Sequence, residues 1–208
     1  MTLTNVYLVD DDPAIRDSLT WLLEAVGITL VSFSSADDFL QQVDVTQSGC
    51  VLLDICMPGM TGVELQEQLL RQDNVLSVIF LTGHADVPTA SKIFKNGAFD
   101  LMEKPVDVDE LLRVIRQALL NSQEKFTWFE QHSRLKSAWN QLTEREKQIL
   151  TLVLEGHPNK VIADRLCLAL RTVEIHRHNM MKKMDSDSPI QLAHDFSKYM
   201  DVNISLVE

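Results

Sequence analysis

The sequence predicts an α/β fold, in which a doubly wound, five-stranded parallel sheet is followed by a helical linker and a small all-helical domain. Short apolar runs alternate with helical patterns five times before residue 120, and no strong strand signal follows residue 142. Charge is also unevenly spread: the net charge is −11 in residues 1–120, +1 in 121–142, +3 in 143–184 and −4 in 185–208. We therefore expect domains at 1–120 and 142–208, joined by a linker at 121–141.

Five apolar runs predict the strands of the sheet. They are Val6–Val9, Leu30–Phe33, Val51–Leu53, Val78–Leu81 and Phe99–Met102. A helical pattern separates each run from the next, and such crossovers join strands that lie parallel. Since both faces of a parallel sheet are covered by helices, we expect a buried sheet with helices on either side.

The helices between these strands are predicted by apolar spacing and by their ends. Asp12 is an N-cap before the first-turn residue Pro13, and Gly27 ends the first helix. The spacing of apolar residues predicts the others at 36–43, 63–70, 87–96 and 111–119, the third after a Pro58-Gly59 turn and the fourth closed by Gly97.

The remainder of the chain reads as helical. Residues 121–142 lack Pro and Gly and carry apolar aromatic residues, which predicts a helical connector that could continue the fifth helix. Thr143-Glu144-Arg145-Glu146 is a capping box, and Gly156 stops the helix that follows it. We expect Asn159 to cap a short helix through Leu166, a longer helix at 172–184 and a last helix opened by Ser188-Pro189.

Polar residues capable of phosphoryl chemistry stand where predicted strands end. Asp10-Asp11-Asp12 follows the first strand, Asp54 the third, Thr82 the fourth and Lys104 the fifth. The carboxyl ends of parallel strands share one edge, where ligands of such sheets bind. Clustered carboxylates repel one another, a cost that Mg²⁺ removes, and a carboxylate can accept a phosphoryl group. Each residue also has an ordinary interpretation, for example Asp12 as an N-cap, but four strand ends together favour the chemical one.

At these residues the sequence resembles the receiver domain of bacterial two-component response regulators. The residues that carry the resemblance, over about 4–120, are Val9-Asp10-Asp11, Leu53-Asp54, Met57-Pro58-Gly59, Thr82-Gly83 and Lys104-Pro105. It implies a flavodoxin-like strand order 2-1-3-4-5, Asp54 as phosphoacceptor, and a cis Lys104-Pro105 bond. It also implies a Mg²⁺ site formed by Asp11, Asp54 and the backbone carbonyl of Cys56, with Asp10 assisting through water.

The resemblance also implies a phosphoryl-binding and switch set, in which one position departs from the family. Thr82 and Lys104 would hold the phosphoryl oxygens. Relatives usually carry Tyr or Phe three residues before the lysine, where the ring reorients on activation, whereas this chain has Leu101. We expect the coupling between Thr82 and the surface of the fourth helix and fifth strand to differ accordingly.

The helical domain shows the pattern of a helix-turn-helix. Helix 159–166, a short turn and the helix from Thr172 would cross closely at Ala163, with Ile162, Leu166 and Val173 facing the core. The second helix would present outward residues at helical spacing, namely Arg171, Glu174, Ile175, His178 and Lys182. Such a helix reads bases in the major groove, while Lys and Arg elsewhere contact phosphates.

Residues 142–196 resemble the LuxR-type DNA-binding domain, on Leu142-Thr143, Arg145-Glu146, Asn159-Lys160, Ile162-Ala163, Thr172-Val173 and His176. With the receiver, the chain resembles the FixJ/NarL group, and Gly83-His84-Ala85-Asp86-Val87-Pro88 favours the FixJ branch. The resemblance implies that Glu174, Ile175 and His178 face bases and that phosphates are contacted by Asn159, Lys160, Thr172, His176 and Lys182. Arg171 and Arg177 could do either, and Glu174 could instead pair with one of them.

The helix-turn-helix departs from the family at two positions in its turn. Ala169 stands where relatives often have a capping Ser, and Cys167 stands where Gly or Asp is usual.

We expect a transcription factor that is switched by phosphorylation and is not an enzyme. The resemblance implies a sensor histidine kinase as phosphoryl donor, promoter DNA and RNA polymerase as partners, and homodimerisation on phosphorylation. An Asp-nucleophile phosphohydrolase is one alternative, but it generally has a second carboxylate two residues after the nucleophile, where this chain has Cys56. The other is a LuxR-like factor switched by a small ligand, which would need an apolar pocket in place of the Asp and Lys residues.

Composition limits location and affinity. No run of about 18 apolar residues and no secretory signal is visible, so we expect no membrane span and a cytoplasmic protein. Cys50, Cys56 and Cys167 lack metal-site spacing and fit a reducing compartment. The charge of −11 argues against nucleic acid only as an average, but the modest +3 of 143–184 predicts weak DNA binding by one copy.

Overall fold

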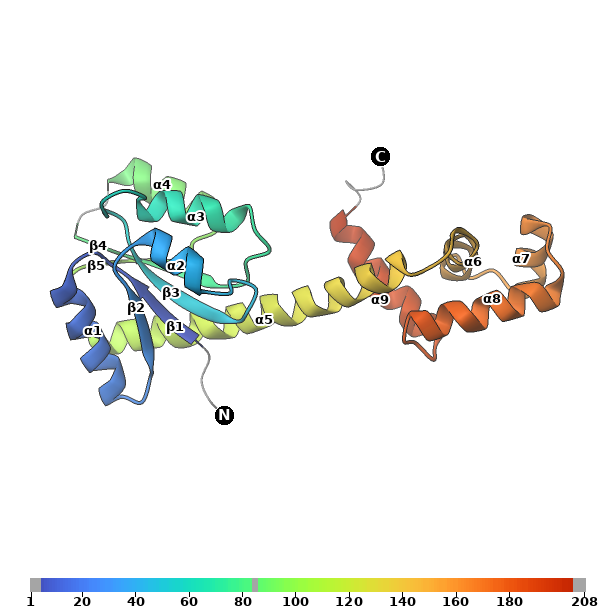
Figure 1. The fold of residues 1–208 in the computed structure, drawn as a ribbon, viewed down its shortest axis with the longest axis horizontal. Helices are drawn as coiled ribbons and strands as arrows, with labels where there is room; N and C mark the ends of the chain where they lie inside the picture. Colours follow the sequence, from blue (N-terminus) through green and yellow to red (C-terminus); the bar gives the residue numbers. More distant parts are fainter. Residues whose placement is uncertain (1–4, 84–85, 204–208) are drawn as a thin grey trace. The chain divides into compact units, whose positions relative to one another are not determined.

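The computed structural model describes residues 5–83 and 86–203, with the side chains of 197–203 excepted (Figure 1). His84 and Ala85 of the 83–88 motif lie outside the described residues, as do the first four and last five residues of the expected domains. The chain forms two compact units, Met1–Phe129 and Glu130–Glu208. Their boundary falls inside the segment that the sequence predicts as the linker.

The first unit contains the predicted five-stranded parallel sheet. Its strands are β1 (Asn5–Val9), β2 (Leu30–Phe33), β3 (Gly49–Asp54), β4 (Ser77–Thr82) and β5 (Asp100–Glu103). They pair in the order β2-β1-β3-β4-β5, every pair parallel. The predicted fold and strand order are therefore confirmed, with strand ends within two residues of the predicted ones. Residues of β1, β3 and β4 are buried on both faces, which explains why these runs are apolar without alternation.

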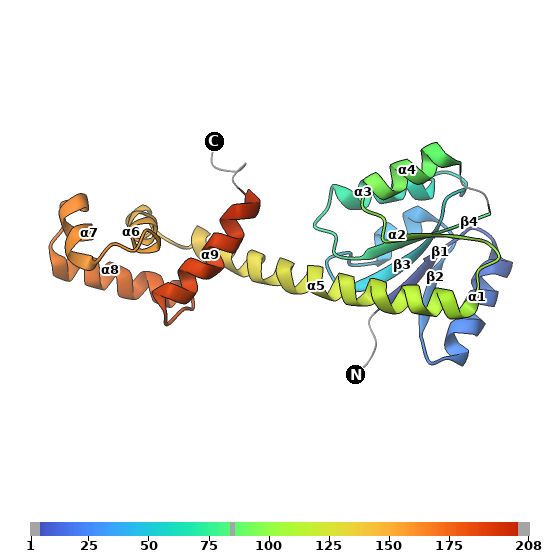
Figure 2. The same ribbon diagram turned by 180° about the vertical axis from the view of Figure 1, so that it is seen from behind.

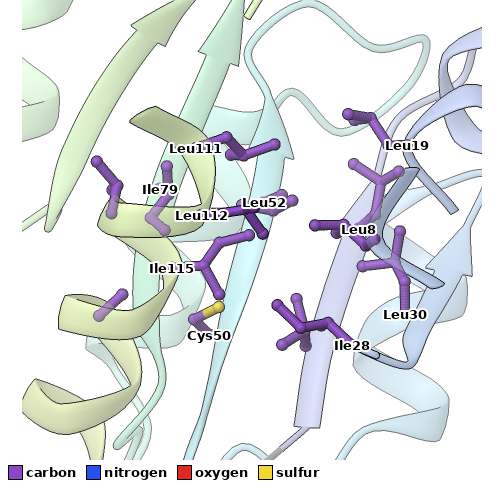
Figure 3. Close-up of a cluster of buried hydrophobic side chains, with 14 of the residues drawn as sticks. Leu8, Leu19, Ile28, Leu30, Cys50, Leu52, Ile79, Leu111, Leu112 and Ile115 are labelled. Atoms are coloured by element: carbon purple, nitrogen blue, oxygen red, sulfur yellow. The ribbon is translucent and has the colours of Figure 1, made fainter. Parts of the chain in front are cut away.

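Helices cover both faces of the sheet (Figures 1 and 2). Helices α2 (Ala36–Gln42), α3 (Gly62–Leu70) and α4 (Val87–Lys95) lie on one face, and α1 (Pro13–Ala25) and α5 (Val108–Asn140) on the other. One apolar cluster joins α1 and α5 to the sheet through residues such as Leu8, Leu19, Leu52 and Ile115 (Figure 3). A second cluster, around Phe39, Leu65, Phe80 and Ile93, packs α2, α3 and α4.

Local signals set the ends of these helices as predicted. Asp12 caps α1 by accepting a hydrogen bond from the backbone N–H of Ala14 at 2.8 Å, and Pro13 opens the helix. Helix α5 continues without a break through residue 140. It is fixed to the sheet at Ser122, whose Oγ accepts from the N–H of Gly49 and donates to the carbonyl of Val75, both at 2.8 Å.

The second unit is helical, with the end of α5 followed by α6 (Glu144–Leu154), α7 (Asn159–Leu166), α8 (Leu170–Lys183) and α9 (Pro189–Asn203). The capping box forms as predicted: Thr143 and Glu146 exchange hydrogen bonds. Its core is an apolar cluster that includes Ile149, Ile162, Val173, Met180 and Phe196. Across the described residues, no helix is long and apolar enough to cross a membrane.

Two expectations about α7 and α8 are wrong. Asn159 does not cap α7; it is the first helical residue, Pro158 holds the N-cap position, and no side chain caps the helix. Helix α8 begins at Leu170 and not at Thr172, because Cys167 ends α7 in the left-handed conformation (φ 53°) and Ala169 is already an extended N-cap residue. The tight connection is therefore only three residues long, from Cys167 to Ala169.

The left-handed backbone of Cys167 yields a stability prediction. A residue with a Cβ is strained there, so Cys167→Gly should stabilise the second unit by about 1 kcal/mol. Urea unfolding of the full chain, with hydrogen exchange over residues 142–196, measures the gain. Cys167→Ala is the matched control because it removes the thiol and keeps the Cβ. An equal gain in both variants would contradict the conformational explanation.

Candidate functional site

Three carboxylates meet at the carboxyl edge of the sheet. Val9 and Leu53 are direct partners in the β1–β3 pair, so Asp10 and Asp54 follow side by side. One oxygen from each of Asp10, Asp11 and Asp54 lies within 4.8 Å of the others. Asp10 and Asp54 are buried and Asp11 is exposed. The strand ends thus bring together the acidic residues that the sequence singled out.

Lys104 joins two of these carboxylates. Its Nζ donates to Asp10 Oδ2 at 2.6 Å and to Asp54 Oδ1 at 2.9 Å. The backbone N–H of Lys104 donates to the carbonyl of Thr82 at 2.7 Å, which brings the ends of β4 and β5 together. The Lys104-Pro105 peptide bond is cis, as expected. The site therefore contains an ammonium group that bridges two of the three carboxylates.

Asp10 is held by the protein on every side. Its Oδ1 accepts from the backbone N–H of Asp12 at 3.0 Å, and its Oδ2 accepts from Lys104. Its carbonyl accepts from Arg16 Nη1 on α1 at 2.7 Å. With both carboxylate oxygens engaged and the residue 1% exposed, Asp10 orders the site, while Asp11 remains accessible.

The electrostatics of the site favour a bound cation. Burial raises the pKa of Asp54 above its ordinary value, the charges of Asp10 and Asp11 raise it further, and Lys104 opposes them. Burial alone would lower the pKa of Lys104, but its hydrogen bonds to Asp10 and Asp54 raise that pKa. One ammonium therefore balances the carboxylates incompletely, and a further cation would offset the remaining repulsion.

The donor set fits Mg²⁺. All three side chains offer hard carboxylate oxygens close enough to share one ion, and Mg²⁺ binds through one or two carboxylates with water in its other positions. A thiophilic metal has no ligand in this group, because no cysteine sulfur belongs to it.

The other predicted residues of the first unit lie on or just past the strands β3, β4 and β5. Thr82 is buried at the end of β4, and Cys56 is exposed just past β3. Leu101 is half-buried and packs against the apolar cluster beneath α3 and α4. Its aliphatic side chain already points into the protein in this state.

Sequence reasoning missed Gly62 and Arg16. A Cβ on Gly62 would lie 2.0 Å from the carbonyl oxygen of Asp54, so only glycine lets α3 begin against the end of β3. The Gly62 N–H donates to the carbonyl of Ile55 at 3.0 Å. Both contacts depend on the tertiary fold, and only the glycine at the start of a helix pattern could have signalled the close approach.

In the second unit, α8 presents a mixed face to solvent. Arg171, Glu174, Ile175, His178 and Lys182 are exposed, and Ile175 retains 54% of its surface. Lys160 is also exposed, whereas four residues are half-buried: Asn159, Thr172, His176 and Arg177. The expected base-facing residues therefore share one accessible helix face.

Two polar contacts hold α8 in place. Arg177 Nη1 donates to Asn159 Oδ1 on α7 at 2.6 Å, and Lys183 Nζ donates to Glu146 Oε2 on α6 at 2.7 Å. Glu146 is 3% exposed and also receives the N–H and hydroxyl of Thr143. The sequence left open a pairing of Glu174 with Arg177. In the structure, Arg177 instead donates to Asn159. Sequence reasoning missed Lys183, which only the packing of α6 on α8 makes significant.

Comparison with known proteins identifies both units. Residues 6–116 match the response regulator receiver domain, and residues 140–196 match the luxR family of bacterial regulatory proteins. The chain is 40% identical over 183 residues to the response regulator protein TmoT of Ectopseudomonas mendocina, covering 88% of this chain and 83% of that one. It is 38% identical to the transcriptional regulatory protein FixJ of Azorhizobium caulinodans, covering 88% and 87%. Among solved structures, it is similar to the response regulator StyR, with a TM-score of 0.81, 38% identity and coverage of 94% and 99%.

The Glu146 contacts yield a pH prediction. Burial alone would raise the pKa of Glu146, but hydrogen bonds from Lys183 and Thr143 lower it below its ordinary value. The ionised carboxylate therefore stabilises the fold above about pH 4.5, and this contribution is lost as the pH falls through the lowered pKa. Glu146→Gln should cost about 1–2 kcal/mol at pH 7, and the cost should shrink toward pH 3.

Urea unfolding of the full chain at both pH values measures this difference. Glu144→Gln is the control, because Glu144 pairs with Lys147 at the same helix end but is exposed. A Glu146→Gln cost that is the same at pH 7 and pH 3 would exclude the ionised pair as its cause.

Proposed function

Since the chain belongs to the response regulators that join a receiver domain to a LuxR-type DNA-binding domain, we propose that phosphorylation of Asp54 controls its binding to promoter DNA. The chain is thus a transcriptional regulator of the FixJ group. What we propose is the residue that accepts the phosphoryl group, the protein that donates it and the way in which phosphorylation changes DNA binding. The observation that carries the proposal is the contact of Lys104 with both Asp10 and Asp54 at the carboxyl edge of the sheet.

Asp54 is the phosphoacceptor in this proposal, and a sensor histidine kinase is the donor. A carboxylate oxygen of Asp54 forms a bond to phosphorus as the bond between phosphorus and the donor nitrogen breaks, and the leaving imidazole takes a proton from water. Lys104 lies 2.9 Å from Asp54 Oδ1, so a small rotation of its side chain would place Nζ against a phosphoryl oxygen. Thr82, buried at the end of the neighbouring strand, would donate to another.

Asp11, Asp54 and the backbone carbonyl of Cys56 would hold Mg²⁺, which when bound neutralises charge that develops on the phosphoryl oxygens. Asp10 would assist through water, since both of its carboxylate oxygens already accept hydrogen bonds within the protein. The exposure of Asp11 supports its role as the accessible direct ligand.

Helix α8 would enter the major groove of promoter DNA. We propose that Glu174, Ile175 and His178 face the bases and that Lys160, Thr172, His176 and Lys182 lie near phosphates. Arg171 is exposed and could reach either. Arg177 donates to Asn159 Oδ1, so these two side chains form a bonded pair, and we assign both to phosphate contacts.

Phosphorylation would act by pairing two copies. The face formed by α4 and β5 carries Val87, which is 82% exposed, and Phe94, which is 49% exposed, and both would be covered in a homodimer. Paired DNA-binding domains would occupy half-sites about one helical turn apart and recruit RNA polymerase. The net charge of +3 in residues 143–184 supports a requirement for two copies.

This role is not that of an enzyme with a separate substrate. An Asp-nucleophile phosphohydrolase would use a carboxylic acid two residues after the nucleophile, where Cys56 stands. We place the protein in the cytoplasm, where the kinase domain and the chromosome are both accessible. The three cysteines are unpaired, as a reducing compartment requires.

Asp54→Asn tests the acceptor. In acetyl phosphate and Mg²⁺, the wild type should gain the mass of one phosphoryl group and bind DNA more tightly, and Asp54→Asn should do neither. Intact mass and retention of DNA fragments are the measurements. Asp12→Asn is the control, because asparagine also caps a helix and Asp12 is outside the proposed ligand set. Modification of Asp54→Asn at the wild-type level would show that the acceptor is another residue.

Lys182→Ala tests the phosphate contacts. The variant should lose affinity for every DNA sequence to a similar degree, and the slope of log K against log salt should become shallower by about 1. Affinity measured at several salt concentrations gives both quantities. Lys136→Ala, an exposed lysine on α5, should leave the slope unchanged. A loss confined to one base position would instead make Lys182 a base-reading residue.

A further inference from the structure

We propose that Gln66 is a positioning residue that transmits the state of Asp54 to helix α4, and this proposal rests on the phosphorylation switch proposed above. Gln66 lies on α3 and is only 2% exposed. Its Nε2 donates to the carbonyl of Ile93 at 3.1 Å and to the carbonyl of Asn96 at 3.3 Å. Both carbonyls belong to the C-terminal end of α4, so a side chain of α3 caps α4.

The cap matters because the last carbonyls of a helix have no partner within it. Gln66 donates from a buried position to the carbonyl of Asn96 and to that of Ile93, which also accepts from the Ala98 N–H at 3.1 Å. The ion pair between these helices is weaker than this buried contact. Glu67 pairs with Lys92 at 2.8 Å, but both side chains remain accessible to water. Beside the apolar packing of Leu65 and Ile93, Gln66 is therefore the buried polar contact that positions α4 against α3.

Helix α3 is in turn fixed to the phosphoacceptor strand. Its first residue, Gly62, donates to the carbonyl of Ile55 at 3.0 Å, and it leaves no room for a Cβ beside the carbonyl of Asp54. Gly62 and Gln66 are four residues apart, so they lie one turn apart on the same side of α3. A displacement of the backbone at Asp54 must therefore move α3, and with it the amide that caps α4.

The cap is also incompletely satisfied. Within the part of the chain that the structure describes, the buried Gln66 Oε1 has no hydrogen-bond donor. The amide nitrogen must face the carbonyls of Ile93 and Asn96, because exchanging the two amide atoms would set the oxygen against two other acceptors. A buried acceptor without a donor stabilises the present arrangement of α3 and α4 less than a satisfied one would, and this lowers the cost of moving the two helices apart.

This route is separate from the side chains of Thr82 and Leu101. It runs from the Asp54 backbone through Gly62 and Gln66 to the end of α4, whereas Thr82 and Leu101 lie on β4 and β5. Removing the amide donor of Gln66 should therefore leave phosphorylation of Asp54 intact and weaken only the effect of that phosphorylation on α4.

Gln66→Met tests the proposal, since methionine has a similar size and no donor. In acetyl phosphate and Mg²⁺, the variant should gain the phosphoryl group at a rate within about twofold of the wild type. In the wild type, phosphorylation should change hydrogen exchange of α4 backbone amides over residues 87–98 and promote self-association. In Gln66→Met that change should be lost and association of the phosphorylated protein should weaken about tenfold.

The matched control is Glu67→Gln, which removes the exposed contact with Lys92 and should behave like the wild type. A purely structural role of Gln66 would alter exchange and thermal stability equally with and without phosphorylation, and would overturn the proposal. So would a Gln66→Met variant that switches like the wild type, or one that no longer takes the phosphoryl group.

Two further results separate the possible failures. If Gln66→Met does not fold, Gln66→Leu replaces it, because leucine is also uncharged and lacks the donor. The wild-type exchange measurement remains decisive, since unchanged exchange in α4 on phosphorylation overturns the proposal. A wild type that gains the phosphoryl group and shows the α4 change, but does not bind DNA more tightly, contradicts the proposed function and leaves the Gln66 route standing.

Discussion

The contact of Lys104 with Asp10 and Asp54 is the interaction on which the first unit's chemistry depends. Three carboxylates at one sheet edge are unfavourable unless cations accompany them, and Lys104 is the cation that the chain itself supplies. The same contact joins the ends of β1, β3 and β5, and the Lys104 N–H bonded to Thr82 adds β4. Any ligand that draws Lys104 away from Asp10 therefore acts on four strand ends at once.

The second unit has a different requirement, since in the proposed function a partly apolar, weakly basic face of α8 stays accessible to DNA. Helix α8 is anchored from behind by Lys183 to Glu146 and by Arg177 to Asn159, which leaves Glu174, Ile175 and His178 free of such anchoring contacts among the described residues. The anchors fix the direction of α8 before DNA is met, so less order has to be imposed on binding. As a consequence, two cationic side chains of α8, Arg177 and Lys183, form hydrogen bonds within the unit.

The sequence predicted what depends on local pattern. Apolar runs located all five strands, and because parallel strands end at one edge, the residues after them could be brought together as Asp10, Asp11, Asp54, Thr82 and Lys104. It did not predict Gly62, Gln66, Arg16 or Lys183, since each acts through a contact outside its own helix that the local pattern does not reveal. Asn159 is a residue for which the local pattern gave the wrong prediction. Its side chain suits an N-cap, but in the folded domain it accepts a hydrogen bond from Arg177 instead.

Calorimetric titration of the wild type and of Lys104→Met with Mg²⁺ is the measurement that most directly tests whether Lys104 compensates the charge of the three carboxylates. If Lys104 holds the carboxylates in the place of a metal, its removal leaves three uncompensated acids, and Mg²⁺ should bind more tightly to the variant. Phosphoryl uptake from acetyl phosphate should nevertheless become slower, because Lys104 no longer meets the phosphoryl oxygens. Mg²⁺ binding that is weaker in Lys104→Met than in the wild type would contradict the account.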